Sequence, residues 1–172
     1  MKILRLSVRA IDGANGWIGR AVAWLTLVMV LITVYDVIMR YIFHAGSVAI
    51  VEAEIHLFAM NFLLAAGWTF LKDGHVRVDL VYTRLNRKKK AWIDLLGSLL
   101  FCIPYCMLII WSVWPFLVDS WSVRECSPDP GGLPCRYVLK ACIPLAFLLI
   151  AAQAISQAIK NLFILTGKEE KL

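Results

Sequence analysis

Residues 21–39 read AVAWLTLVMVLITVYDVIM, a run of nineteen positions with one charged side chain, Asp36. The hydrocarbon core of a bilayer is about 30 Å thick and is crossed by about 20 helical residues. Three more runs of this kind follow, at residues 51–71, 91–118 and 139–165. A single span in lipid must satisfy its own backbone hydrogen bonds, which a helix does. The sequence therefore predicts an all-α integral membrane protein with four transmembrane helices in one domain, residues 1–172.

The composition supports a membrane protein over a soluble one. Hydrophobic residues make up 60% of the 172 residues and charged residues 17%, against about 45–50% and about 25% in soluble domains. The first ten residues are basic, but the apolar run that follows extends from Trp17 to Met39. That run is too long for the core of a secretory signal, about 7–15 residues. We therefore expect a retained first helix.

Basic residues predict the orientation of the four spans. Of the 18 Lys and Arg, fourteen lie in the amino-terminal segment, the connection between spans two and three, or the carboxyl-terminal tail. The other four are Arg40, Arg124, Arg136 and Lys140. Because positive charge is retained on the cytoplasmic side, both termini are expected in the cytoplasm. This bias accounts for the net charge of +6, and no soluble basic domain is present to bind nucleic acid.

Charged residues inside or beside spans are costly and suggest function. Asp36 and Arg40 are four residues apart at the outer end of span one; Glu52 and His56 are four apart at the outer end of span two, with Glu54 on another face. One interpretation is a network of Asp36, Arg40 and Glu52 where the two helices meet. The alternative is that these groups are hydrated at headgroup depth. A substrate or proton path through them is a third hypothesis, which the apolar middle of span three disfavours.

Uncharged polar and small residues predict helix packing. Asn61 in span two, and Gln153 and Gln157 in span four, can form hydrogen bonds to neighbouring helices. The run Ala65-Ala66-Gly67 allows close helix approach. Pro144 can kink the fourth helix, as Pro104 can kink the third. Such helices pack against protein, within this chain or in a partner.

The connection between spans two and three, residues 73–90, reads DGHVRVDLVYTRLNRKKK. A helix from about Val78 would place Val78, Val81, Tyr82 and Leu85 on one face and basic residues towards another. This pattern predicts an interfacial amphipathic helix on anionic phospholipid of the inner leaflet; a solvated basic loop is the alternative. The basic residues of the segment are Arg77, Arg84, Arg87, Lys88, Lys89 and Lys90.

The outer connection at residues 120–138 reads SWSVRECSPDPGGLPCRYV, and its prolines and glycines predict turns. Cys126 and Cys135 flank those turns, and a disulfide between them is a hypothesis if the loop faces an oxidising compartment.

The sequence lacks motifs of catalysis and of cofactor binding. No GxxxxGK[ST] phosphate loop and no GxSxG nucleophile motif occurs. The histidines are His44, His56 and His75, of which His44 and His75 lie in connections, so paired axial ligation of haem is disfavoured. We expect no enzyme and no cofactor, and a small helical bundle of this kind usually works with a partner.

The chain resembles the small membrane subunit of the tripartite ATP-independent periplasmic (TRAP) transporters. The likeness runs from span one to span four. It consists of an ordered set of elements: Arg40-Tyr41 at the end of span one, an acid at Glu52 or Glu54, Gly67, the Gly-His-x-x-x-Asp element from Gly74 and His75 to Asp79, and Lys140 with Pro144.

The resemblance implies a non-catalytic subunit in a sodium-driven uptake system for carboxylates or other organic acids. Its partner would be a large membrane subunit that moves substrate by an elevator-type motion, and this chain would bind and brace the scaffold of that partner. A periplasmic binding protein would deliver substrate and could touch the outer loop. Two other functions stay open: a stand-alone ion-coupled transporter using Asp36, Glu52 or His56, and a membrane anchor of a redox complex.

Overall fold

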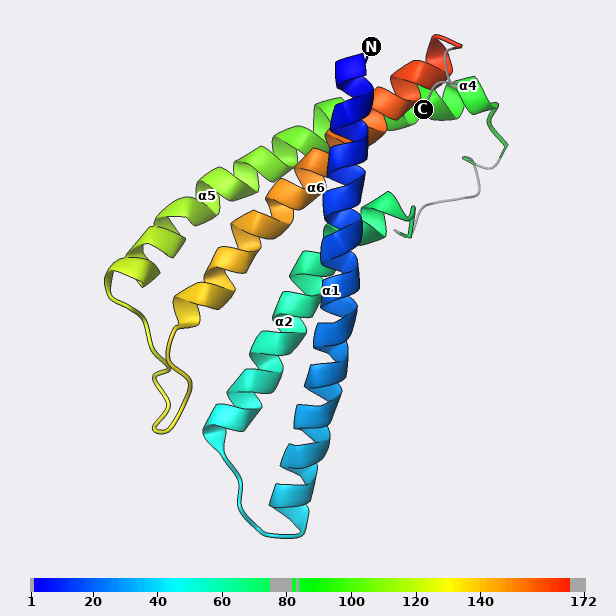
Figure 1. Cartoon of the computed structure of the whole chain (residues 1–172). Helices are drawn as coiled ribbons and strands as arrows, with labels where there is room; N and C mark the ends of the chain where they lie inside the picture. The colour runs from blue at the N-terminus through cyan, green and yellow to red at the C-terminus, as the bar shows by residue number, and fades with distance from the viewer. Residues whose placement is uncertain (1, 75–81, 83, 168–172) are drawn as a thin grey trace.

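The computed structural model describes residues 2–74, 82 and 84–167. Within this part of the chain the regular structure is helical and no strand is present. Four helical segments are long and apolar enough to cross a membrane. The prediction of an all-α protein with four spanning helices is therefore confirmed (Figure 1).

The helices extend beyond the apolar runs that predict them. The first begins at Lys2 and has 40 residues, which is about 60 Å of helix at about 1.5 Å per residue. The first half of this helix is too polar to be recognised from sequence as part of a span. In the structure that half is nevertheless helical, and it packs against the last helix of the chain. The helices are α1 (Lys2–Tyr41), α2 (Val48–Leu71), α4 (Arg87–Gly97), the π-helical turn η1 (Ser98–Cys102), α5 (Ile103–Ser122) and α6 (Arg136–Leu165).

The third span is one continuous helical segment made of α4, η1 and α5, residues Arg87–Ser122. The π-helical turn lies directly before Pro104, which occupies the start of α5. Proline has no N–H to donate to the preceding turn and its ring collides with a regular helical carbonyl. A wider turn relieves both problems, so Pro104 produces the irregularity that its position predicts.

Helix α6 is the centre of the bundle, since it packs against α1, α2, α4, η1 and α5. Small side chains along α6 allow these helices to approach closely, and polar side chains between them add hydrogen bonds. The buried residues of α6 are Cys142, Pro144, Ala146, Ala151, Gln153, Ala154, Ser156, Ala158, Asn161 and Phe163.

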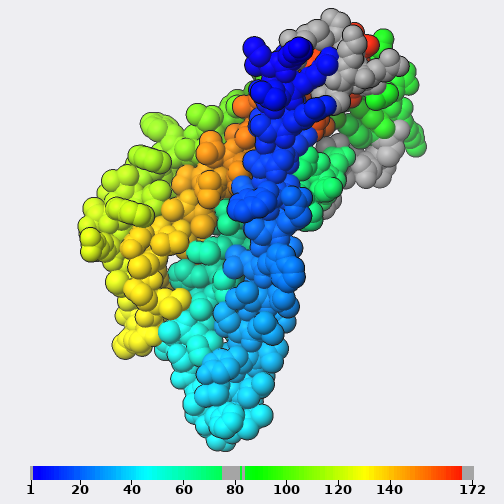
Figure 2. All heavy atoms as spheres, viewed as in Figure 1, coloured from blue at the N-terminus to red at the C-terminus, as the bar shows by residue number. Residues whose placement is uncertain are grey.

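Two helical hairpins give the molecule its shape. The α1–α2 pair and the α5–α6 pair diverge towards their two connections, residues 42–47 and 123–135, as Figure 1 shows. The amino terminus, the carboxyl-terminal end of α6 and the start of α4 lie at the opposite end. In the space-filling view the side chains of the two hairpins are in contact, with α6 lying against both α1 and α2 (Figure 2). We call the end with the two connections the outer end and the other the inner end.

Candidate functional site

The inner end holds a polar cluster between α1 and α6. Asp12 of α1 accepts hydrogen bonds from Gln153 Nε2 at 3.0 Å and from Ser156 Oγ at 2.7 Å, both on α6. Its second carboxylate oxygen pairs with Lys160 Nζ at 2.5 Å. Gln153 and Ser156 are fully buried. One carboxylate therefore binds three side chains of α6 at the helix interface.

Sequence reasoning missed Asp12, because it lies before the apolar run in the glycine-containing segment DGANGWIG. The signal that could have found it is spacing. Asp12 and Asn15 are three residues apart on α1, and Gln153, Ser156 and Lys160 follow at intervals of three and four on α6. Residues at these intervals share one face of a helix, so two polar faces were available to meet.

Three helices meet tightly at Gly67. Asn15 of α1 donates to Gln153 Oε1 at 2.8 Å and more weakly to the Leu149 carbonyl at 3.4 Å. A Cβ added at Gly67 of α2 would lie 3.1 Å from Leu149 Cβ and 3.2 Å from Asn15 Cγ, and closer still to Asn15 Oδ1. The absent side chain at this position is what lets α2 pack against both α1 and α6.

At the outer end, Glu52 of α2 holds the connection between α5 and α6. Its carboxylate accepts a short hydrogen bond from Ser127 Oγ and one from the Leu133 N–H at 2.6 Å, and Arg136 Nη2 lies 3.6 Å away. Glu52 is buried. A Cβ at Gly132 would lie 2.8 Å from Glu52 Oε2, so glycine is needed there for the loop to close over the carboxylate. We call this set of contacts the outer clasp.

The network predicted from Asp36, Arg40 and Glu52 is therefore split in two. Asp36 and Arg40 form a short ion pair within α1, where a spacing of four residues brings their side chains together. Glu52 instead uses its carboxylate on the outer loop, 75 residues and more along the chain. His56 Nδ1 is 2.7 Å from the Glu52 carbonyl oxygen, a contact within one turn of α2. Glu54 is half-buried, and among the described residues its buried Oε1 atom has no hydrogen-bond partner.

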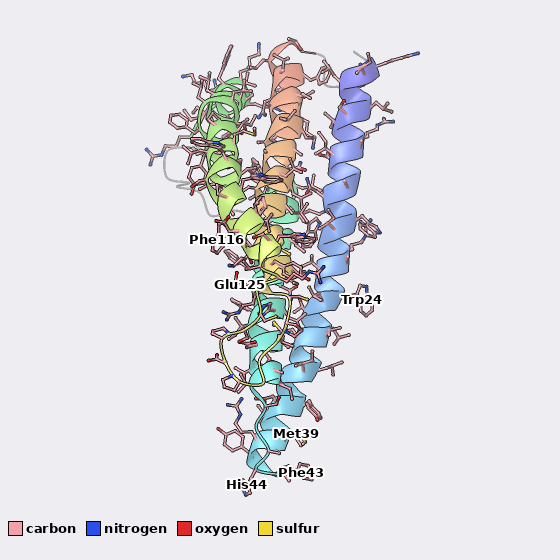
Figure 3. All side chains as sticks on the ribbon, turned by 90° about the vertical axis from the view of Figure 1, so that its left-hand side faces the viewer. Trp24, Met39, Phe43, His44, Phe116 and Glu125 are labelled. Atoms are coloured by element: carbon pink, nitrogen blue, oxygen red, sulfur yellow. The ribbon has the colours of Figure 1, made fainter. Side chains whose placement is uncertain are left out.

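A second tie at the outer end joins Lys140 of α6 to Glu125. Lys140 makes a short ion pair with Glu125 and lies 3.9 Å above the Phe116 ring of α5; Figure 3 labels Phe116 and Glu125. Ser120 Oγ also donates to Glu125 at 2.6 Å. The hydrogen bond from Lys140, followed by that from Ser120, lowers the pKa of Glu125 below its usual value. The connection is thus attached to both helices that it joins.

The remaining predicted packing residues lie at different depths. Asn61 of α2 accepts a hydrogen bond from Thr26 of α1 at 3.0 Å, so it does contact a neighbouring helix. Pro144 is buried inside α6, one turn after Lys140. Its ring leaves the Lys140 carbonyl without the usual helical donor.

The disulfide hypothesised across the outer loop is not formed in the structure, where Cys126 and Cys135 are both free thiols. Cys126 is exposed and its Sγ is 3.4 Å from the Arg124 carbonyl oxygen. Cys135 accepts a hydrogen bond from the Tyr137 hydroxyl at 3.1 Å. Each thiol thus has its own local partner.

Part of the predicted basic segment lies outside the described residues. This applies to His75, Arg77 and Asp79, and with them to most of the proposed amphipathic helix. The described cations are Arg84, which is exposed, and Arg87, Lys88, Lys89 and Lys90, which form the first turn of α4. Their helix continues into the third span, so this cluster marks the inner end of that span. Within the described ranges, no group of three His, Cys, Asp or Glu residues could hold a metal ion.

Comparison with known proteins gives one family match. The model of the DctQ component of tripartite ATP-independent periplasmic transporters matches residues 29–163. The chain belongs to the DctQ family. This match confirms the resemblance to TRAP small subunits. It includes Gln153, Ser156 and Lys160 of the inner polar cluster, but begins after Asp12 and Asn15.

A relative from Vibrio cholerae serotype O1 agrees with the DctQ assignment. It is called the C4-dicarboxylate TRAP transporter small permease protein DctQ and is 24% identical over 165 residues, covering 84% of this chain and 69% of the relative. No solved structure matches the chain significantly. DctQ proteins are transporter components of the inner membrane, and they work with a large membrane subunit and a binding protein. The chain is therefore a multi-pass small permease subunit.

Proposed function

We propose that this DctQ subunit braces the large membrane subunit of a sodium-driven, binding-protein-dependent uptake system. It binds the scaffold of that elevator-type partner and widens the platform against which the moving part works. Its termini face the cytoplasm and its outer end faces the periplasm, as the basic residues indicate. The substrates in this proposal are carboxylates or other organic acids. The name of the Vibrio cholerae relative assigns C4-dicarboxylates to that protein.

One observation carries the bracing role: the polar side chains of the bundle are used to tie its own helices together. Asp12 at the inner end and Glu52 at the outer end each engage several partners from another segment. Between them many large apolar side chains are exposed, as along α5. A bundle closed by internal ties and covered by apolar side chains is suited to hold a partner in lipid rather than to open for cargo.

The proposal is tested by co-expressing the tagged chain with the large membrane subunit that accompanies it. The large subunit should co-purify in mild detergent. Vesicles that contain both subunits, supplied with the binding protein and an inward sodium gradient, should accumulate a labelled dicarboxylate. Vesicles that contain this chain alone should accumulate none. Uptake by the chain alone would contradict the proposal and favour a stand-alone transporter.

Arg40 and Asp79 are candidate interface residues. Arg40 is half-exposed, with 49% of its side chain accessible, although it pairs with Asp36, so its guanidinium can reach a second partner. Replacing Arg40 or Asp79 by alanine should lower the amount of large subunit that co-purifies without changing which solute is taken up. Arg124→Ala, at an exposed arginine of the outer connection, is the matched control. A changed substrate preference in Arg40→Ala would contradict the assignment.

A further inference from the structure

Two backbone hydrogen bonds hold the ends of the outer loop side by side. The Arg136 N–H donates to the Glu125 carbonyl at 3.0 Å, and the Ser127 N–H donates to the Leu133 carbonyl, also at 3.0 Å. The loop that joins α5 to α6 therefore has two adjacent antiparallel segments at its base. We call these segments, residues 125–127 and 133–136, the loop neck.

Cys126 and Cys135 lie opposite each other in the loop neck. Between the two hydrogen bonds the first segment has one residue, Cys126, and the second has two, Pro134 and Cys135. Two residues opposite one is the arrangement of a β-bulge. Opposed residues of antiparallel segments have Cα atoms about 4.5–5.5 Å apart, and a disulfide needs Cα atoms about 4.4–6.8 Å apart. The spacing of the loop neck thus suits a bond between the two sulfurs.

The surroundings of the two thiols are suited to a reaction between them. Cys126 is exposed, so a reagent on the outer side can reach it, and Cys135 is half-buried. The Tyr137 hydroxyl donates to Cys135 Sγ at 3.1 Å and also interacts electrostatically with Cys126. Both sulfurs therefore lie near one hydroxyl group.

The backbone of Cys135 is in an unusual conformation. Its φ is 68°, in the left-handed region that few residues other than glycine adopt. Cys135 is also the residue before α6, a position that usually has extended backbone. Residues held in such conformations cluster at functional sites. The loop neck thus keeps Cys135 in an unfavourable conformation while it opposes a second cysteine.

We propose that Cys126 and Cys135 form a thiol–disulfide switch that locks the outer clasp. The inference rests on the proposed function, whose orientation places the outer end in the periplasm, an oxidising compartment. One cysteine thiolate attacks the disulfide of a periplasmic thiol oxidoreductase, and the other then displaces that protein from the mixed disulfide. The S–S bond forms as the two cysteines lose two electrons and two protons, and the oxidoreductase gains them and leaves as a dithiol.

The disulfide acts on the outer clasp through the two loop residues that bind Glu52. Ser127 Oγ and the Leu133 N–H both donate to the Glu52 carboxylate, and both residues lie inside the loop that the bond closes. In the structure the clasp is formed while both thiols are free, so the bond is not needed to make it. A cross-link removes many of the conformations that the loop gains when it leaves Glu52. The oxidised loop therefore opens less often than the reduced one.

Mass spectrometry of the complete transporter tests the bond. Spheroplasts that express it are quenched with an excess of a thiol-alkylating reagent, before and after treatment with a membrane-impermeant phosphine. Trypsin cuts after Arg124 and Arg136, so both cysteines lie in one peptide, residues 125–136. Without phosphine this peptide should carry no alkyl group and be two hydrogens lighter than the dithiol; after phosphine it should carry two alkyl groups.

The third span supplies the internal control for this measurement. Cys102 and Cys106 lie inside that span, and both should be alkylated in either sample once the protein is unfolded in the reagent. A 125–136 peptide with two alkyl groups in the untreated sample would overturn the inference.

Hydrogen exchange tests the lock on the clasp. Exchange of residues 127–133 should be several-fold slower in the oxidised chain than in the reduced one, while residues 42–47 of the other outer connection should not change. Cys126→Ser replaces an exposed thiol by a hydroxyl of similar size, and it should show the faster exchange with or without phosphine. Equal exchange in the two wild-type forms would overturn the lock.

Co-purification of the large subunit, measured on the same samples, separates this inference from the proposed function. Two free thiols in a chain that retains the large subunit would remove the switch and leave the bracing function standing. A disulfide in a chain that never retains the large subunit would support the switch and contradict the bracing function.

Discussion

Replacing Gly67 by alanine is expected to destabilise the bundle at the point where α1, α2 and α6 meet. The new methyl group would lie 3.1 Å from Leu149 Cβ and nearer than 3 Å to Asn15 Oδ1, closer than side chains normally approach. Asn15 is buried and holds Gln153 at 2.8 Å. It cannot move aside without lengthening that hydrogen bond, so α2 must shift away from α6.

Three terms set the size of the effect. Overpacking costs about 1–3 kcal/mol, and loss of an interhelical hydrogen bond in a membrane protein costs on average about 0.6 kcal/mol. Alanine gains up to about 1 kcal/mol over glycine in helix propensity. Together they predict a net loss of roughly 1–3 kcal/mol in the free energy of unfolding.

The assay is denaturant or thermal unfolding of the purified subunit in one detergent, followed by helical circular dichroism. Gly97→Ala is the matched control, because a Cβ at Gly97 of α4 meets nothing within 4 Å; this variant should be neutral or slightly stabilised. Adding Asn15→Ala to Gly67→Ala should cost less than the sum of the two single changes, since the methyl group then has room. Equal stability of Gly67→Ala and Gly97→Ala would refute the reasoning.

Two further predictions concern the outer end. Gly132→Ala should open the outer clasp, because the new Cβ would lie 2.8 Å from Glu52 Oε2, and hydrogen exchange of the 123–135 connection should rise several-fold. Gly46→Ala is the control, because a Cβ at Gly46 meets nothing within 4 Å, and it should leave that exchange unchanged. Equal exchange in both variants would count against the clasp. The Lys140–Glu125 ion pair should be independent of pH in the neutral range. Because the pKa of Glu125 is lowered from 4.5 in the folded protein, the stabilisation by this ion pair is present above about pH 4.5 and is lost as the pH falls through the folded value. Hydrogen exchange near Glu125, corrected for its intrinsic pH dependence, should therefore be the same at pH 7 and pH 5.5, and a marked rise at pH 5.5 would contradict the assignment.

The four spans could be predicted from sequence because each is a long apolar run, and lipid leaves few alternatives for such a run. The Asp36–Arg40 pair could also be predicted, since a spacing of four on one helix fixes its geometry. The partners of Glu52 could not, because they lie on a loop whose path depends on how the two hairpins pack. The amino-terminal half of α1 was missed for a related reason: its helical state is supported by contacts with α6, more than 130 residues away.

The position of α6 at the centre of the bundle has a consequence for biogenesis. Asp12 leaves the ribosome early, but its partner Lys160 lies 148 residues later. At about 5–20 residues per second, their synthesis is separated by roughly 7–30 s. During that interval α1 and α2 are inserted without the helix that completes their packing, and the Asp12 carboxylate lacks the three α6 partners that it has in the folded protein. The last segment to be made is thus the one that packs against the other three spans, and a nascent chain stalled before residue 153 would lack every α6 side chain that binds Asp12.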